Sequence, residues 1–292
     1  MRRKLAGTIY GAVASTSYGT NPLFALPLYS AGIGVNSVLF YRYFFACIIY
    51  YIWLKLVKKT NLKISVREFF PLLIVALFFS FSSLTLFTAF KYIEAGIACT
   101  ILFIYPVIVA VIMSVFYNEK LTKTTLFSIL LTSSGIILLY KGGSGAALSL
   151  KGIGIVLLSA LLYALYIVFV KKNKILQHIK SEKLSFYVML FGLSVYIVNL
   201  NFCTKLQIPD NPVLWLFTLA LAIFPTIVSI ETITIAIKLI GSTTTAILGA
   251  LEPLTAVFFG VIFFHEELTL RIIIGIAAIL TGVLLIVVKK IK

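Results

Sequence analysis

Long apolar stretches separated by short polar ones dominate the pattern of the chain. A helix needs about 20 apolar residues to cross the hydrocarbon core of a bilayer, and ten stretches approach or exceed that length. They cover roughly residues 5–29, 36–57, 69–90, 95–117, 123–140, 152–170, 185–204, 213–237, 242–264 and 269–288. The connections between them are too short for a soluble domain. The pattern therefore predicts an all-α integral membrane protein with ten transmembrane helices.

The composition agrees with this prediction. Of the 292 residues, 61% are hydrophobic and only 12% are charged, and the mean hydropathy is +1.10. These values lie far outside the range of soluble proteins. We therefore expect the lipid bilayer to surround most of the chain.

The positive charges follow the predicted spans unevenly. Cytoplasmic loops of membrane proteins are enriched in Lys and Arg, and a cytoplasmic amino terminus places nineteen of these residues inside and five outside. The inside residues are Arg2, Arg3, Lys4, Lys55, Lys58, Lys59, Lys63, Arg67, Lys120, Lys123, Lys171, Lys172, Lys174, Lys180, Lys183, Lys238, Lys289, Lys290 and Lys292, and the outside ones are Lys91, Lys141, Lys151, Lys205 and Arg271. We expect a cytoplasmic membrane protein with both termini inside. The same distribution accounts for most of the net charge of +16, so nucleic acid is not an expected partner.

An internal repeat relates residues 91–141 to residues 238–288 at a constant offset of 147. Ten of the 51 aligned positions are identical, among them Pro106 with Pro253 and Gly135 with Gly282. An odd number of predicted spans separates the copies, which inverts the second copy in the membrane. Inverted repeats are typical of secondary transporters. The sequence thus predicts two inverted five-helix halves, residues 1–143 and 144–292.

Several motifs resemble the EamA-type families of the drug/metabolite transporter superfamily. They are Tyr41-Arg42-Tyr43-Phe44, Pro106, Glu119-Lys-Leu-Thr122 and Gly135 in the first half, and Glu252-Pro253, Glu266-Glu-Leu-Thr269 and Gly282 in the second. The resemblance covers nearly the whole chain and implies a transporter of ten helices in two inverted halves. It leaves the substrate open, because members of that superfamily carry amino acids, nucleotide sugars, nucleosides, phosphorylated sugars and drugs. One departure is that the Trp-Gly often seen in spans one and six is Tyr18-Gly19 and Tyr163-Ala164 here.

Three prolines are expected to interrupt helices within predicted spans. Pro106, Pro225 and Pro253 lack the N–H that would pair with the carbonyl four residues earlier. Such a break is tolerated in a membrane beside protein or a water-filled cavity. We interpret the three prolines as hinge or kink positions, with simple packing as the alternative for Pro225.

The Glu-x-Leu-Thr motifs lie at the junctions of spans, where Thr122 and Thr269 are expected to cap the following helix. His265 stands beside two glutamates, but this spacing does not place two ligands on one helical face. The Gly-rich residues 142–145 lack the Lys-Ser/Thr of a phosphate-binding loop. No metal or cofactor is therefore predicted.

Three charges fall inside predicted spans: Arg42, Glu231 and Glu252. A charge at the centre of a membrane helix costs about 2.5 to 3.5 kcal/mol, so each needs a partner or water. Glu231 either pairs with Lys238, two turns away, or contacts a solute. Arg42 and Glu252 either form a structural ion pair or bind a solute. In the second case Glu252 meets an ammonium or exchanges a proton, which leaves proton coupling open, and Arg42 holds a carboxylate or phosphate.

Polar aromatic side chains accompany these charges. Tyr18 and Asn21 are three residues apart in span one, as are Tyr163 and Tyr166 in span six, so each pair is expected to share a helical face. Tyr105 aligns with Glu252 in the repeat. Such side chains suit the lining of a solute site, and ordinary packing is the alternative for each.

These observations predict a secondary transporter that exports a small organic metabolite by alternating access, with an amino acid or another amine-bearing solute as the first choice. A phosphate-bearing metabolite is the nearest rival, although phosphates usually recruit several cationic groups. A lipid flippase is a further alternative. An enzyme is not expected, because two His and one Asp supply little acid–base machinery.

Overall fold

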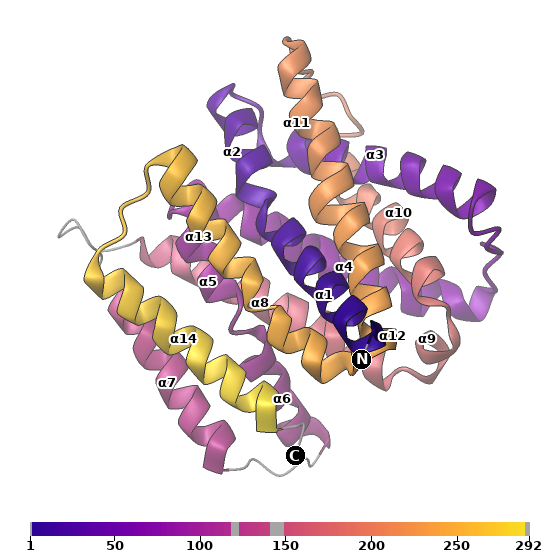
Figure 1. Cartoon of the computed structure of the whole chain (residues 1–292). Helices are drawn as coiled ribbons and strands as arrows, with labels where there is room; N and C mark the ends of the chain where they lie inside the picture. Colours follow the sequence, from indigo (N-terminus) through magenta and orange to yellow (C-terminus); the bar gives the residue numbers. More distant parts are fainter. Residues whose placement is uncertain (1, 118–122, 141–148, 290–292) are drawn as a thin grey trace.

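The computed structural model of the protein describes residues 2–117, 123–140 and 149–289, which form helices joined by short connections (Figure 1). Within these ranges no β-strand is present. In chain order the elements are α1 (Arg2–Gly19), α2 (Asn21–Ser30), α3 (Val35–Leu56), α4 (Val66–Ala89), α5 (Ala95–Leu102), α6 (Tyr105–Tyr117), α7 (Lys123–Tyr140), α8 (Leu150–Lys172), α9 (Lys174–His178), α10 (Ser181–Asn199), α11 (Pro212–Ala222), the π-helix η1 (Ile223–Val228), α12 (Ser229–Leu248), α13 (Leu251–Phe264) and α14 (Leu270–Lys289).

Six helical segments of the described chain are long and apolar enough to cross a membrane. They are Val35–Leu56, Val66–Ala89, Ala95–Tyr117, Leu150–Lys172, Ser181–Asn199 and Pro212–Ile233. Large apolar side chains point outward, for example Phe70, Phe116 and Leu216, which are 64%, 74% and 64% exposed. A soluble monomer rarely exposes so much apolar surface. The architecture is therefore that of an all-helical, multi-pass membrane protein, and the number of ten spans stays a prediction.

Helix breaks occur beside the prolines that the sequence singles out. Residues 103–104 form a turn between α5 and α6, directly before Pro106, and residues 249–250 form one between α12 and α13, before Pro253. The two turns are 146 residues apart, one residue short of the offset of 147 found in the sequence repeat. Pro253 has no N–H to donate to the Gly249 carbonyl. This carbonyl instead accepts the backbone N–H of Glu252 at 3.0 Å. The broken helix thus keeps its hydrogen bond by tightening.

The boundary expected between residues 237 and 242 lies elsewhere. α12 continues through this region to Leu248, so the helix ends at residues 249–250 instead. The physical reason is that a single glycine, Gly241, is tolerated inside a helix, whereas Pro253 removes a donor and forces the break.

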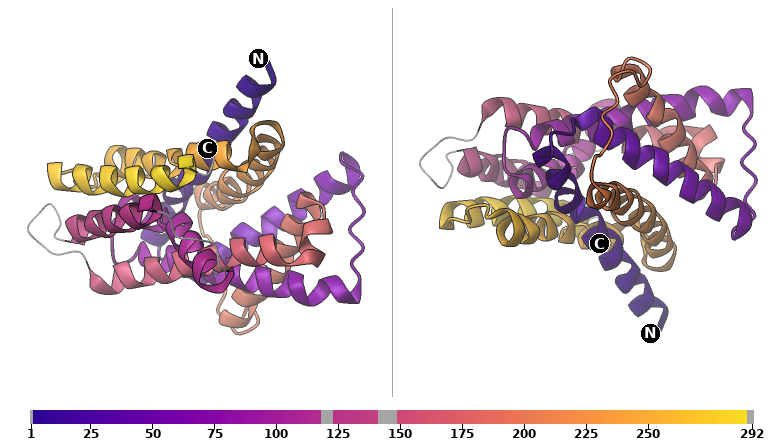
Figure 2. Two further views of the ribbon diagram at one scale, coloured as in Figure 1. Left: turned by 90° about the horizontal axis from the view of Figure 1, so that it is seen from below. Right: turned by 90° about the horizontal axis from the view of Figure 1, so that it is seen from above.

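The helices of the two halves pack in equivalent pairs. α1 packs against α12 as α8 packs against α4, and α3 contacts α10. α7 and α14 lie side by side at one end of the molecule, and α3 and α10 lie toward the other end (Figure 2). Exchanging the segments that the sequence repeat relates maps the first of these contacts onto the second, and the α3–α10 contact onto itself. The two inverted five-helix halves stay a prediction, and their expected junction at residues 143 and 144 lies outside the described residues.

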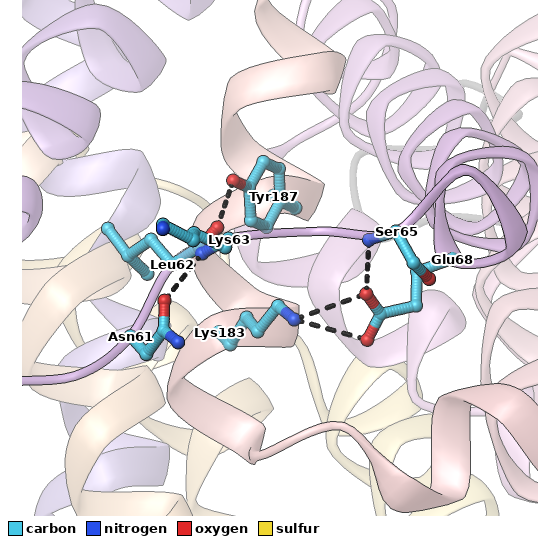
Figure 3. A network of polar contacts seen from close by, with 7 residues as sticks. All are labelled: Asn61, Leu62, Lys63, Ser65, Glu68, Lys183 and Tyr187. Carbon is cyan, nitrogen blue, oxygen red and sulfur yellow. Dashed lines mark hydrogen bonds and ion pairs between the residues drawn. The ribbon is translucent and has the colours of Figure 1, made fainter.

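A polar network fixes the start of α4 against α10 (Figure 3). The Glu68 carboxylate accepts the Ser65 backbone N–H at 2.7 Å, as in a capping box, and forms an ion pair with Lys183 at 3.1 Å. The Tyr187 hydroxyl donates to the carbonyl of Leu62. Because Glu68 belongs to the first half and Lys183 to the second, the network joins the two halves.

Candidate functional site

Arg42 lies in the middle of α3 and is only 1% exposed. Its Nε donates a hydrogen bond to the Thr226 hydroxyl at 2.9 Å. Its Nη1 is buried and has no hydrogen-bond partner. No carboxylate of the described chain forms an ion pair with Arg42, so the guanidinium carries a charge that no acidic side chain balances.

The partner of Arg42 comes from the π-helix η1. Thr226 is 3% exposed and follows Pro225 directly, and its hydroxyl donates to the Leu221 carbonyl at 2.9 Å. This is the carbonyl that Pro225 leaves without its helical donor. The Ser17 hydroxyl of α1 donates to the Phe224 carbonyl at 2.6 Å, and this carbonyl also accepts the backbone N–H of Ser229. At Leu221 a side-chain donor thus replaces the missing backbone donor, which is a known way of stabilising a helix break inside a membrane.

Three aromatic rings surround the Arg42 guanidinium. Its central carbon lies 5.3 Å from the ring centroid of Phe87 and 6.0 Å from those of Tyr18 and Tyr43. Rings within about 6 Å attract a cation through their quadrupole. This attraction offsets part of the cost of burial, but a ring face is a weaker partner than a carboxylate.

Four half-buried tyrosines form a cluster next to this arginine: Tyr18, Tyr105, Tyr163 and Tyr166. The ring centroids of Tyr105 and Tyr163 lie 4.7 Å apart in an edge-to-face arrangement. Tyr163 and Tyr166 stack on one face of α8, with centroids 5.8 Å apart. Tyr18 lies close enough to Tyr163 for an electrostatic interaction. We refer to these four residues as the tyrosine cluster.

Glu252 is a half-buried residue in the first turn of α13, beside the tyrosine cluster. A helix amino terminus favours a negative charge, which explains this position. Its carboxylate makes no hydrogen bond or ion pair with any described residue, and it interacts electrostatically with Tyr18 and Tyr105. Tyr18 interacts with both Glu252 and Arg42. The alternative of a structural Arg42–Glu252 ion pair is therefore not what the structure shows.

Close helix packing brings Tyr18 next to Glu252. A Cβ on Gly19 would lie 2.5 Å from the backbone oxygen of Glu252 and 2.6 Å from Cβ of Thr255. Only glycine therefore allows α1 to approach α13 this closely at residue 19. This contact explains why a Gly follows Tyr18.

The shared helical face expected for Tyr18 and Asn21 is interrupted. α1 ends at Gly19 and α2 begins at Asn21, because Pro22 starts the new helix. Asn21 instead folds back, and its Nδ2 donates to the Tyr18 carbonyl at 2.8 Å. Its Oδ1 is buried and has no partner among the described residues, so Asn21 offers an unused acceptor beside Tyr18.

Glu231 belongs to a different cluster. It forms an ion pair with Lys58 at 3.2 Å and accepts a hydrogen bond from the Tyr50 hydroxyl at 3.2 Å. Lys58 also lies over the ring of Trp53, 4.8 Å from its centroid. The alternative partner Lys238 has a side chain outside the described residues. The structure therefore gives Glu231 an ionic partner, unlike Glu252.

Glu266 follows His265, whose left-handed backbone turns the chain between α13 and α14. The Glu266 carboxylate accepts the backbone N–H groups of Ala95 and Gly96 at 2.7 and 3.2 Å, and so caps α5 in the other half. Burial raises the pKa of this carboxyl from its usual range to about 7, although the two hydrogen bonds oppose that shift. Thr269 accepts the Ile272 N–H at 3.4 Å at the start of α14, while the equivalent motif at residues 119–122 lies outside the described residues.

Comparisons with known proteins identify the family of this chain. A profile of the EamA-like transporter family matches the chain twice, at residues 5–141 and 150–288. The chain belongs to the EamA-like transporter family. It is similar to an uncharacterized transporter of Archaeoglobus fulgidus, with 26% identity over 87% of this chain and 88% of the relative. It is also similar to the uncharacterized transporter YvbV of Bacillus subtilis, with 24% identity over 78% of this chain and 75% of the relative.

A solved structure, titled only as the crystal structure of a protein, shares the fold of this EamA-like transporter. Its TM-score is 0.68 with 17% sequence identity, covering 96% of this chain and 95% of the other. At this identity the likeness concerns the fold alone. The twofold match of the family profile is the stronger finding, because each match covers one of the segments that the sequence repeat relates.

Sequence reasoning singled out Arg42, Glu252 and the tyrosines, and it missed Thr226 and Phe87. The signal for Thr226 was available, since a hydroxyl residue directly after a mid-helix proline is well placed to satisfy the freed carbonyl. Phe87 had no such signal among the twenty-four Phe of the chain.

Proposed function

We propose that this EamA-family transporter exports a small amine-bearing metabolite, with amino acids as the first choice, across the cytoplasmic membrane by alternating access. The single observation that carries the proposal is the pair of opposite charges without ionic partners beside the tyrosine cluster. Arg42 is fully buried and Glu252 is half-buried, and neither has an ion pair within the described chain.

A zwitterionic solute fits this pair of charges. Its carboxylate would satisfy Nη1 of Arg42, and its ammonium would meet Glu252 and the free Oδ1 of Asn21. Aromatic rings of the tyrosine cluster would contact the apolar part of the solute and keep hydroxyl groups available for hydrogen bonds. A phosphate-bearing solute fits less well, because Arg42 is the one cation among the residues described for this site.

The helix breaks support alternating access. α1 and α2, α5 and α6, and α12 and α13 are each separated by a short break, and η1 interrupts a further span. Broken helices around a central solute site are typical of secondary transporters built from repeats. Under this proposal both termini lie in the cytoplasm, and a proton exchanged at Glu252 couples transport to the proton gradient.

The proposal is tested by uptake of radiolabelled L-amino acids into proteoliposomes. We expect Arg42→Gln and Glu252→Gln to lower the rate by at least about tenfold, because each removes a charged partner of the solute. Arg67→Gln and Glu267→Gln make the same chemical changes at exposed positions and should transport like the wild type.

Wild-type rates in both Arg42→Gln and Glu252→Gln would refute the site. A wild type that moves no amino acid would refute the substrate class. Repeating the measurement with Glu231→Gln distinguishes the role of Glu231 from that of Glu252. Because Glu231 forms an ion pair with Lys58, its substitution should lower stability more than solute affinity.

A further inference from the structure

The Thr226 hydroxyl has a fixed orientation. Its one hydrogen is donated to the Leu221 carbonyl at 2.9 Å, so the oxygen faces Arg42 as an acceptor only. The Nε of Arg42 donates to this oxygen at 2.9 Å. Thr226 therefore defines which edge of the guanidinium is occupied and which remains for another ligand.

The remaining edge presents Nη1, for which no described residue supplies an acceptor. A buried donor without an acceptor costs free energy, and a buried charge without a counterion costs more. The surrounding rings of Phe87, Tyr18 and Tyr43 offset only part of that cost. An anionic group of a solute would supply the missing partner.

We propose that Thr226 is a positioning residue that makes the site selective for solutes with a carboxylate. By holding Nε, it directs the terminal nitrogens of Arg42 toward the solute. This inference rests on the proposed function and deepens it, because it assigns selectivity for the acidic end of the solute to a hydroxyl that does not itself touch the solute.

The position of Thr226 depends on the π-helix. η1 spans residues 223–228 and contacts both α1 and α3, so its extra residue turns Thr226 toward Arg42. π-helical turns within α-helices are often found at functional sites. Selectivity therefore depends on the irregular backbone at Pro225 as well as on Arg42.

The test compares recognition of a carboxylate with recognition of its neutral analogue. The probe is the radiolabelled L-amino acid that the wild type transports best, with the unlabelled amino acid and its amide as competitors. We expect the wild type to prefer the acid by at least about tenfold, as for a lost charge-assisted hydrogen bond. In Thr226→Val this preference should fall below about threefold and KM should rise by about tenfold, with Vmax changed less than KM. Thr226→Ser keeps the hydroxyl and should retain the preference.

Ser17→Ala is the matched control. It removes the other side-chain hydrogen bond to η1, at the Phe224 carbonyl, and leaves the Arg42–Thr226 bond in place. Equal loss of preference in Ser17→Ala would mean that Thr226 acts only on the stability of η1, and would overturn the inference. If Thr226→Val does not fold, Thr226→Cys provides a similar volume with a weak acceptor, and should show the same loss.

The outcomes separate the two proposals. Amino-acid transport in the wild type with unchanged preference and KM in Thr226→Val, or in Thr226→Cys, overturns the role of Thr226 and leaves the proposed function standing. A wild type without amino-acid transport overturns the proposed function, and this inference with it.

Discussion

At the scale of single residues, the site is defined by side chains whose normal partners are missing. Arg42 has one nitrogen without an acceptor, Asn21 has an oxygen without a donor, and Glu252 lacks a cation within the described chain. Buried polar groups are nearly always satisfied in proteins, so several exceptions in one region indicate a place where a ligand completes the bonding. Glu231, whose needs are met by Lys58 and Tyr50, serves as the contrast.

Gly19 provides a residue-scale prediction. Gly19→Ala places a Cβ 2.5 Å from the backbone of Glu252, so α1 and α13 must separate. We expect a loss of about 1 to 3 kcal/mol in the free energy of unfolding, together with slower transport, because overpacking displaces the neighbouring backbone. Thermal or denaturant unfolding in detergent micelles measures the stability.

Gly154→Ala is the control for this change. A Cβ at Gly154 in α8 meets nothing within 4 Å, so alanine should be neutral or stabilise the helix slightly. Equal destabilisation by both substitutions would show that steric contact at Gly19 is not the cause.

At the scale of elements, the main feature is the set of breaks between and within helices. Two of the breaks, at residues 103–104 and 249–250, lie shortly before Pro106 and Pro253, and the role of these prolines as hinges stays a prediction. The π-helix at Pro225 and the break at Gly19–Thr20 were not predicted. Whether a proline produces a kink, a break or a π-helix depends on which neighbouring group replaces its missing hydrogen bond, and here the Thr226 hydroxyl does so.

The joint between the loop at Glu266 and α5 gives an element-scale prediction of pH dependence. Burial raises the pKa of Glu266 to about 7, and Glu94 adds like-charge repulsion. The folded protein therefore favours the protonated form of the Glu266 carboxyl. The contribution of Glu266 to the free energy of unfolding is greatest below the ordinary pKa of Glu, and it is lost as the pH rises through about 7.

Glu266→Gln removes this titration. The Tm of the wild type minus the Tm of Glu266→Gln should fall as the pH rises from about 4.5 to about 7. Above pH 7 this difference should stay constant. Thermal melts across this range measure it. A difference that grows in favour of the wild type with rising pH would show that the two backbone hydrogen bonds, rather than burial, dominate the pKa.

At the scale of the whole molecule, the two halves are joined at both ends. Lys183 and Glu68 connect them at the end that the charge distribution places in the cytoplasm. At the opposite end Gln207 donates to the Gly32 carbonyl and to the Ser37 hydroxyl, both at 3.1 Å. Under the proposed alternating access we expect these contacts to form and break in turn, since a solute site that opens to both sides at once would leak.

The predicted orientation is a property of the whole molecule and is tested by labelling in intact cells. We expect a membrane-impermeant maleimide to label Ile208→Cys, which is 72% exposed on the predicted outer side, and to label Lys63→Cys only after permeabilisation. Cys203→Ser provides the background, because Cys47 and Cys99 are buried. The reverse labelling pattern would invert the assigned orientation.

The sequence alone determined the class of the protein and much of its organisation. Apolar length, the offset of 147 residues and the prolines are local properties of the chain, and they suffice to predict membrane helices, a repeat and its breaks. Only the tertiary structure decided which polar groups meet: that Arg42 binds Thr226 rather than Glu252, and that Glu231 pairs with Lys58. The reason is physical, because the partners of a buried charge depend on the distances and angles between helices. Packing contacts such as that of Gly19 with Glu252 set these distances, and the spacing of residues along the chain does not encode them.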